Sequence, residues 1–344
     1  MRLDIATFLT ALYVITDDLY QRHFAHLKPR RRGKKVELSD SEVLTLAICS
    51  QWLGWSERVF ISYALSNWLP YFPRLLSYSA YNRRSRDLAG VLVSLGQRIG
   101  QELERYARIQ GVLKPVGVYE VIDSVPVPLM RRCRGDQHRL FGLEAAIGKG
   151  GSDKSWYYGV KLLLSVTPSG VITGFMIGPA STEDRWMAEH FLCYRMDPWA
   201  GPLEAEDMPR RRRYKGYVGP TGPIWPRAAA GELGLVPYIA DDGFSGREWI
   251  AHWREDYGAP VLTTSGYKGE EAPKARREHS GRRQIVETVN SILTGTLGLS
   301  FPGARTTWGL LTRLAAKVAA VNIGIYLNRL FGRADLTHDS LFTL

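Results

Sequence analysis

The chain has 344 residues and a hydrophobic content of 45%, which is typical of a globular protein with one large domain or two ordinary ones. Its formal net charge is +11, so a polyanion is an expected partner, although ribosomal and membrane-surface proteins share this bias. The three cysteines form no Cys-x-x-Cys pair, which argues against a zinc site and against a disulfide framework.

Two apolar stretches have the length of targeting or membrane segments. The first lies near the N-terminus, but Asp4 precedes it where a signal peptide carries basic residues. The second lies near the C-terminus, and Arg313, Lys317 and Arg329 interrupt it. We therefore expect a cytoplasmic protein without a membrane partner.

Residues 1–112 are predicted to form a helical N-terminal region. The segment "LSDSEVLTLAICSQWLG" begins with capping residues and ends on Gly54, and residues 81–111 carry an apolar stripe at helical spacing. The run "KPRRRGKK" precedes the first of these helices. Taken alone it favours a solvated basic loop, but beside helices it also suits an arm that contacts phosphates. The candidate DNA contacts in this region are Arg30, Arg31, Arg32, Lys34, Lys35, Arg83 and Arg84.

From residue 113 strands and helices follow one another. After a first strand at 117–127, a basic, glycine-rich segment leads to two strands joined by the turn "PSG". The remaining predicted elements are a helix at 182–196, a strand at 235–244, a helix at 245–258, a strand at 259–264 and helices at 281–298 and 306–332. This order predicts an α/β fold in which a mixed sheet is flanked by helices.

Residues 197–235 interrupt this plan, because they contain six prolines and the basic run Arg210, Arg211, Arg212 and Arg213. A loop of this length is either functional or disordered. A disordered linker is one interpretation. The other is an insertion whose arginines and aromatic residues stack on unpaired bases and bind phosphates.

Three carboxylates are candidates for one site. Asp123 interrupts a buried, β-branched strand, Asp241 follows another strand, and Glu287 lies on the polar face of the helix at 281–298. Alone, Glu287 is explained by a surface pair with Arg283. Together the three acids can hold two Mg²⁺ ions, which promote in-line phosphoryl transfer. Asp242 competes with Asp241 for the second position.

Other polar residues are interpreted as structural. Asp184 and Arg185 are taken as a solvated helix start, and Lys161 either contacts DNA or extends its ammonium group to the surface. The histidines share no ligand spacing and are predicted to be packing or surface residues.

Four segments in order, "VIDSVPVP", "YYGVKLLLSVTPSGVITGFMIGPASTED", "YIADDGFSG" and "RRQIVETVNSIL", resemble bacterial DDE-type insertion-sequence transposases. The resemblance extends from about residue 38 to 330 and implies a ribonuclease-H-like catalytic domain. It implies Asp123, Asp241 and Glu287 as the catalytic, metal-binding acids, with Arg283 as a DNA contact. The Ala-Asp-x-Gly-aromatic pattern of the family supports Asp241. Ser280 and Thr294 depart from it, because many relatives carry Tyr and Lys there.

The predicted protein is therefore a DNA transposase with a DNA-binding region at 1–112 and a catalytic domain at 113–335. It would use two Mg²⁺ ions, with Mn²⁺ as a substitute, to cleave transposon ends and transfer the freed 3′-OH strand to target DNA. The resemblance further implies a homodimer on double-stranded DNA near the nucleoid. Three alternatives remain: a nuclease that does not join strands, a catalytically inactive DNA-binding regulator, and, less supported, a glycoside hydrolase.

Overall fold

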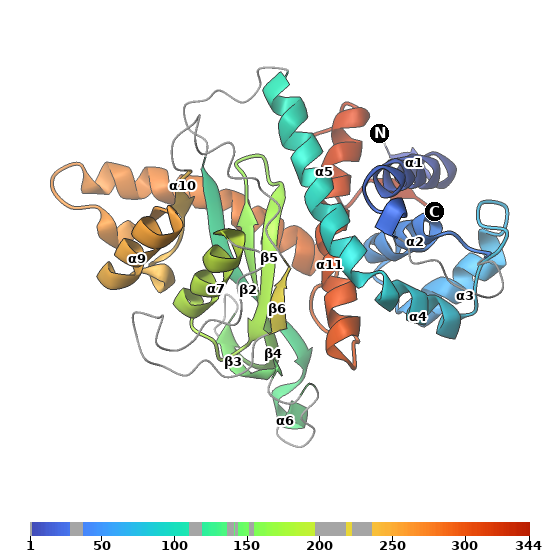
Figure 1. The fold of residues 1–344 in the computed structure, drawn as a ribbon, viewed down its shortest axis with the longest axis horizontal. Helices are drawn as coiled ribbons and strands as arrows, with labels where there is room; N and C mark the ends of the chain where they lie inside the picture. Colours follow the sequence, from blue (N-terminus) through green and yellow to red (C-terminus); the bar gives the residue numbers. More distant parts are fainter. Residues whose placement is uncertain are drawn as a thin grey trace. The chain divides into compact units, whose positions relative to one another are not determined.

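The structure is a computed structural model that describes residues 2–27, 37–109, 119–135, 141, 144–150, 155–196, 218–221 and 236–344 (Figure 1). Its contacts divide the chain into two compact units. Unit 1 consists of Met1–Ile99 together with Ile292–Leu344, and unit 2 consists of Gly100–Ser291. This division differs from the sequence-based boundaries at 112 and 335, because the C-terminal segment packs with the N-terminal helices through long-range contacts.

Unit 1 is helical, and its helices come from both ends of the chain. They are α1 (Ile5–His23), α2 (Asp40–Leu53), α3 (Glu57–Asn67), α4 (Tyr78–Asp87), the first part of α5 (Ala89–Ile109), a π-helical segment (Ile292–Thr296) and α11 (Thr307–Leu330), with a 3-10 turn at Ala25–Leu27. The short strands β1 (Leu3–Asp4) and β9 (Phe342–Thr343) pair in parallel. This pairing joins the N-terminal and C-terminal segments.

The ends of α2 follow from its local sequence, as predicted. The Ser39 hydroxyl accepts a hydrogen bond from the Glu42 N–H at 3.1 Å, and the Glu42 carboxylate accepts one from the Ser39 N–H at 2.6 Å. This reciprocal pair satisfies two backbone donors that the first helical turn leaves unpaired. The helix ends at Gly54, whose φ of 64° lies in the left-handed region that favours glycine.

The apolar stripe at 81–111 was predicted as a single helix, but the structure breaks it at Leu88. Leu88 has φ −97° and ψ 9°, outside the helical region, and separates α4 from α5. Tyr81, Leu92 and Leu95 are nevertheless all buried. The break keeps the apolar side chains directed toward the core, so their spacing did not reveal it.

Helix α11 is the central helix of unit 1. It contains an 18-residue window that is apolar enough to cross a membrane, and 83% of that window is buried inside the structure. Arg313 and Lys317 lie in every 18-residue stretch of this helix, so basic residues do interrupt it, but two charges do not remove it from the candidate spans. The window is weak evidence for a membrane span, because core helices pass the same test.

Unit 2 contains a mixed sheet with the strand order β6-β5-β4-β2-β7-β8, and β3 also pairs with β4. The strands are β2 (Glu120–Met130), β3 (Ala146–Gly150), β4 (Ser155–Val166), β5 (Ile172–Pro179), β6 (Val218–Thr221), β7 (Tyr238–Ile239) and β8 (Val261–Leu262). Neighbours β2, β4 and β5 are antiparallel, whereas β2, β7 and β8 are parallel. Two strands were not predicted: β3 lies in the glycine-rich segment, and β6 lies within 197–235.

Strand β2 extends well past Asp123 and ends at Met130, beyond the predicted strand end at residue 127. Pro126 and Pro128 lie opposite Lys161 and Gly159 of β4. Within the described residues, β7 pairs with β2 only at Glu120 and Val121, so one edge of β2 has no ladder partner beyond that point. Proline lacks an N–H and is tolerated at such an edge. The two prolines therefore do not end the strand.

The helices of unit 2 cover both faces of this sheet. They are α6 (Arg132–Gly135), α7 (Asp184–Met196), α9 (Arg247–Tyr257) and α10 (Ala272–Ser291), with 3-10 turns at Asp242–Phe244 and Thr264–Gly266. Ile122 of β2 belongs to the apolar core formed with α7 and α9. The next residue, Asp123, contacts α10. Because successive strand residues point to opposite faces, α10 covers the face opposite α7 and α9.

The predicted fold class is confirmed. Unit 2 is an α/β structure in which a mixed sheet is flanked by helices, and the N-terminal region is all-α. Most predicted strands and helices of the second region are present in the predicted order. The main differences in extent are that α10 begins at Ala272, before the predicted start at 281, and that β7 and β8 are only two residues long.

Candidate functional site

Two of the three predicted acids converge where the parallel strands β2 and β7 meet. In the ladder, Glu120 lies opposite Tyr238 and Val121 opposite Ile239. The same offset carries Asp123 opposite Asp241, just beyond the end of β7. Both carboxylates approach one guanidinium, because Arg283 Nη2 lies 3.9 Å from Asp123 Oδ1 and 3.9 Å from Asp241 Oδ2.

The structure separates Asp241 from its neighbour Asp242, which the sequence could not do. Asp241 accepts a hydrogen bond from the Gly243 N–H at 2.8 Å and directs its other oxygen toward Arg283. Asp242 instead accepts hydrogen bonds from the Thr264 hydroxyl at 2.5 Å and the Ser265 N–H at 2.9 Å. These bonds, the one from Thr264 first, hold the pKa of Asp242 below its usual value. Asp241 is therefore the member of the pair that lies with Asp123.

One face of α10 carries the polar residues of the site. Asn290 Nδ2 donates a hydrogen bond to Asp123 Oδ2 at 3.2 Å, and Arg283 lies two turns earlier on the same face. Glu287 occupies the position between them, one turn from each, and its side chain is exposed. The helix thus presents Glu287 on the face that contacts Asp123, although only Arg283 and Asn290 touch the two aspartates directly.

Burial makes both central carboxylates hard to ionise in the absence of a cation. The pKa of Asp123 is raised to about 7, chiefly by burial, with further contributions from the charges of Asp241 and Asp184, while Arg283 acts in the opposite direction. Burial also raises the pKa of Asp241, again opposed by Arg283. Acidic groups with pKa values raised by burial and mutual repulsion are typical of functional sites.

A third acid, Asp184, reaches this cluster and was missed in the sequence. It is the first residue of α7, where its carboxylate accepts hydrogen bonds from the Ser124 hydroxyl at 2.7 Å and from Lys161 Nζ at 3.0 Å. A Cβ built on Gly243 would lie 2.9 Å from Asp241 Oδ1 and 3.1 Å from Asp184 Oδ2. The two carboxylates therefore flank the same glycine. The sequence signal was an acid at the start of the helix that follows β5, which is also what an ordinary helix start carries.

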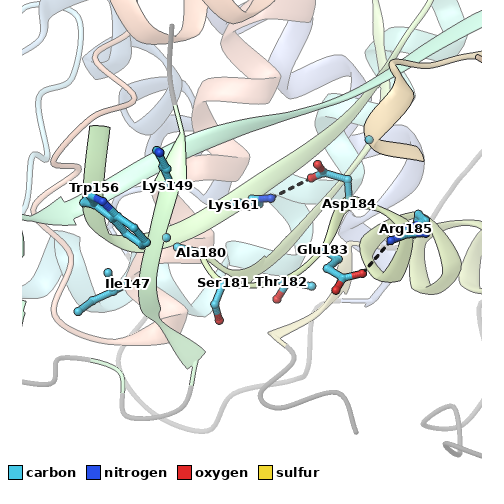
Figure 2. A pocket seen from close by; sticks show the side chains of 12 residues that line it. Ile147, Lys149, Trp156, Lys161, Ala180, Ser181, Thr182, Glu183, Asp184 and Arg185 are labelled. Atoms are coloured by element: carbon cyan, nitrogen blue, oxygen red, sulfur yellow. Dashed lines mark hydrogen bonds and ion pairs between the residues drawn. The ribbon is translucent and has the colours of Figure 1, made fainter. Parts of the chain in front are cut away.

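A groove of about 460 Å³ borders this acidic cluster (Figure 2). One wall is the β3–β4 hairpin, which contributes Ile147, Gly148, Lys149, Trp156 and Lys161, and the other is the segment Ala180–Arg185. Gly243 also lines it, next to Asp241 and Asp242. The groove therefore leads from the surface of the hairpin to the acids.

His279 supports the strand end that carries Asp241. Its Nε2 donates a hydrogen bond to the Ala240 carbonyl at 2.8 Å, so its Nδ1 accepts from the Tyr267 hydroxyl at 3.2 Å. The residue is buried, and burial lowers the pKa of its imidazole. A neutral His279 suits both hydrogen bonds, and it ties α10 to the backbone immediately before Asp241. This agrees with the interpretation of the histidines as packing residues.

The donor atoms of the site suit Mg²⁺. Within the described ranges, no group of three His, Cys, Asp or Glu side chains is arranged to hold a metal ion. Mg²⁺, however, usually takes one or two protein carboxylates and completes its octahedron with water and phosphate oxygens. Asp123 and Asp241 could supply two hard oxygen ligands, and a bound cation would favour their ionised forms.

The residues predicted to contact DNA differ in whether the structure describes them and in whether their side chains are exposed. Nine of them lie outside the described residues: Arg30, Arg31, Arg32, Lys34, Lys35, Arg210, Arg211, Arg212 and Arg213. Arg83 is exposed on α4. Arg84 is largely buried, where it pairs with Asp40 and donates to the Leu38 carbonyl. The guanidinium of Arg84 is thus occupied by protein groups within unit 1. Arg283, the last predicted contact, lies between Asp123 and Asp241.

Comparison with known proteins identifies no relative of this chain. No family model matches it, and no curated protein or solved structure matches it significantly.

Proposed function

We propose that the protein is a DDE-type DNA transposase that cleaves transposon ends and joins the freed 3′-OH strand to target DNA. The observation that carries this proposal is the parallel register of β2 and β7, which brings Asp123 and Asp241 together beneath the polar face of α10. The strand order also supports it, since three antiparallel strands continued by two parallel ones form a ribonuclease-H-like sheet.

Asp123 and Asp241 would hold Mg²⁺, with Glu287 on the adjacent face of α10 as the remaining acid. Bound Mg²⁺ would supply water activation and charge stabilisation for an in-line displacement at phosphorus. Asn290 holds one oxygen of Asp123, and the other oxygen faces Arg283. His279 holds the backbone before Asp241. These contacts orient the carboxylates before any substrate binds.

Arg283 has a place in this chemistry because of its position between the acids. Its guanidinium offsets part of their negative charge, and its largely buried side chain limits its motion. When a phosphodiester enters, the same group is within reach of the phosphate oxygens, which it can bind in bidentate fashion. In this proposal Arg283 contacts the scissile region of the DNA.

The test is Mg²⁺-dependent cleavage and strand transfer on a duplex that carries the DNA ends flanking the gene, whether the protein acts as a homodimer or otherwise. We expect Asp123→Asn, Asp241→Asn and Glu287→Gln to abolish both steps, because each removes a charged metal ligand. Asp242→Asn is the matched control, since Asp242 faces Thr264 and Ser265 instead of Arg283. It should retain activity.

The outcomes separate the alternatives. DNA binding without cleavage in wild type, with either Mg²⁺ or Mn²⁺, would contradict the transposase in favour of an inactive DNA-binding regulator. Cleavage without joining would indicate a nuclease. Activity that survives Glu287→Gln but is lost in Asp184→Asn would move the third acid from α10 to the start of α7.

A further inference from the structure

We propose that the groove between the β3–β4 hairpin and the segment Ala180–Arg185 binds an unpaired nucleotide of the DNA substrate, with its base stacked on Trp156. This deepens the proposed transposase function, because it states how the DNA strand enters the site. The inference stands on an exposed aromatic ring, on the cations around it and on the shape of the groove.

Trp156 is placed to stack against a flat partner. It is 54% exposed, although an indole ring is ordinarily covered in a folded protein. Lys149 lies directly opposite Trp156 in the β3–β4 ladder, and its Nζ is 5.9 Å from the ring centroid. Arg132 Cζ lies 5.5 Å from the same centroid. An exposed aromatic ring flanked by cations is the arrangement with which proteins bind single-stranded nucleic acid.

The charges in the groove are divided between its ends. At one end are Lys149 and Trp156, with Arg132 beside them. At the other end Asp184 pairs with Lys161 and Glu183 pairs with Arg185 (Figure 2). Gly243 also lines this end and adjoins Asp241, which has no lysine partner of this kind among the described residues. A nucleotide in the groove therefore has a basic, aromatic surface for its base and outer phosphate, while its other phosphate reaches the acids that would hold Mg²⁺.

The walls of the groove are set close together by a glycine. A Cβ at Gly148 would lie only 2.4 Å from the Ala180 carbonyl oxygen, so β3 can approach this segment only because residue 148 has no side chain. A groove of about 460 Å³ has the size of a pocket for one small ligand. It suits one nucleotide released from its base pair, as in enzymes that extrude a nucleotide from the duplex.

The first test measures binding of a fluorescein-labelled oligo(dT) of twelve nucleotides by the full-length protein without divalent metal. We expect Trp156→Ala to weaken binding by roughly tenfold, in line with the stacking energy of one base, and Trp156→Phe to retain most of it. Trp308→Ala is the matched control, because Trp308 is 65% exposed but lies on α11, outside the groove. It should bind as wild type does.

The second test uses the salt dependence of the same binding. Lys149→Ala should reduce the slope of log affinity against log salt by about 0.7, the value for one phosphate contact with a single strand. Lys268→Ala removes an exposed lysine that does not line the groove and should leave the slope unchanged. Circular dichroism checks that each variant is folded.

Three results would overturn the inference: equal affinity of Trp156→Ala and wild type for oligo(dT), an equal loss in Trp308→Ala, or an equal loss on a blunt duplex of the same length. The last result would mean that the hairpin binds duplex DNA and not an unpaired nucleotide. Because these assays contain no metal and no cleavage step, their outcome is independent of the cleavage test for the proposed function.

Discussion

At the scale of single residues, arginines that look alike in sequence have different surroundings. Arg83 is exposed on α4, whereas the neighbouring Arg84 is 12% exposed and forms an ion pair with Asp40. Asp40 also accepts a hydrogen bond from the Tyr20 hydroxyl at 2.7 Å. A charged pair this well buried depends on both of its members, because removing one leaves the other desolvated without compensation.

We therefore predict that Arg84→Ala destabilises unit 1 by roughly 3 kcal/mol, the cost of breaking a buried ion pair. The measurement is chemical denaturation followed by circular dichroism. Arg83→Ala is the control and should change the free energy of unfolding by less than about 0.5 kcal/mol. A stable Arg84→Ala protein that binds DNA more weakly would instead identify Arg84 as a phosphate contact.

At the scale of elements, local hydrogen bonds decide where helices begin, and tertiary contacts decide where they lie. The serines before α2 and α4 illustrate the first point. Ser39 forms a reciprocal capping pair with Glu42, whereas Ser77 occupies the N-cap position of α4 without a side-chain hydrogen bond. The sequence already distinguishes the two positions, because the third residue after Ser39 is Glu42 whereas the third residue after Ser77 is Ala80.

Ser39→Ala should lower the free energy of unfolding by about 1 kcal/mol, because the Glu42 N–H in the first turn of α2 loses its hydrogen-bond acceptor. Ser77→Ala also removes a serine hydroxyl from an N-cap, but this hydroxyl makes no capping hydrogen bond. The substitution should therefore lower the free energy of unfolding by clearly less. Thermal or chemical denaturation of both variants gives the comparison. Equal losses would show that the capping pair of α2 does not stabilise the helix.

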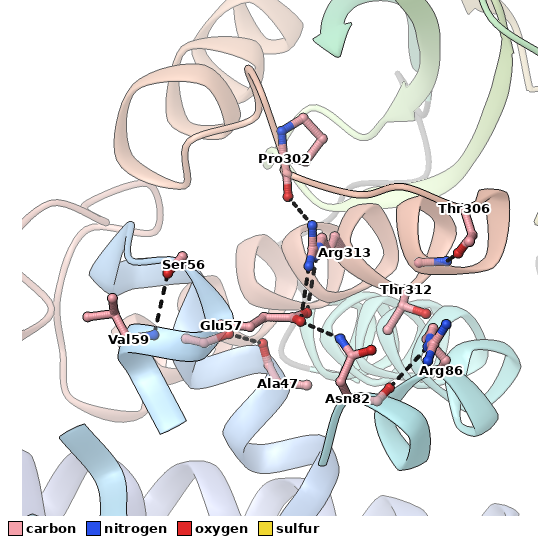
Figure 3. Close-up of polar contacts among 12 residues, drawn as sticks. Ala47, Ser56, Glu57, Val59, Asn82, Arg86, Pro302, Thr306, Thr312 and Arg313 are labelled. Carbon is pink, nitrogen blue, oxygen red and sulfur yellow. Dashed lines mark hydrogen bonds and ion pairs between the residues drawn. The ribbon is translucent and has the colours of Figure 1, made fainter. Parts of the chain in front are cut away.

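At the scale of the whole molecule, unit 1 unites segments from both ends of the chain. Arg313 of α11 forms a two-point ion pair with Glu57 of α3, at 3.1 Å and 3.0 Å, and Asn82 of α4 donates to the same carboxylate at 2.6 Å (Figure 3). Lys317, one turn further along α11, is buried and donates to Gln51 Oε1 at 2.9 Å and to the Leu297 carbonyl. These polar contacts therefore fix α11 against α2, α3 and α4.

The buried lysine makes the stability of unit 1 depend on pH. Burial, and secondarily the charge of Arg313, lowers the pKa of Lys317 to about 8. Since the unfolded chain then binds more protons between about pH 8 and 10.5, the free energy of unfolding rises as the pH increases through this window. The full effect is on the order of 3 kcal/mol, because a pKa lowered by one contributes about 1.4 kcal/mol.

The measurement is urea denaturation of wild type and Lys317→Met at pH 7 and pH 9.5. Wild type should gain stability relative to Lys317→Met on going to the higher pH. The comparison with the methionine variant cancels the contributions of other groups that titrate in this range. A constant difference between the two proteins at both pH values would mean that folding does not lower the pKa of Lys317.

Within the candidate site, sequence reasoning succeeded where the signal was local. Asp123 stood out because a carboxylate is costly in a buried strand, and Arg283, Glu287 and Asn290 shared a face by helical spacing alone. It failed for Asp184, whose importance comes from hydrogen bonds to Ser124 and Lys161 on two other strands. Its position in the chain resembled that of any acid at a helix start.

The sequence by itself determined the class of fold, the order of most elements, the caps of α2 and the approach of one strand acid toward another. These properties depend on alternation, helical spacing and hydrogen bonds between residues close in the chain. Only the tertiary structure decided between Asp241 and Asp242, brought Asp184 into the cluster and grouped α11 with the N-terminal helices. These outcomes depend on strand register and on packing between distant segments, where a shift of one residue reverses the direction of a side chain.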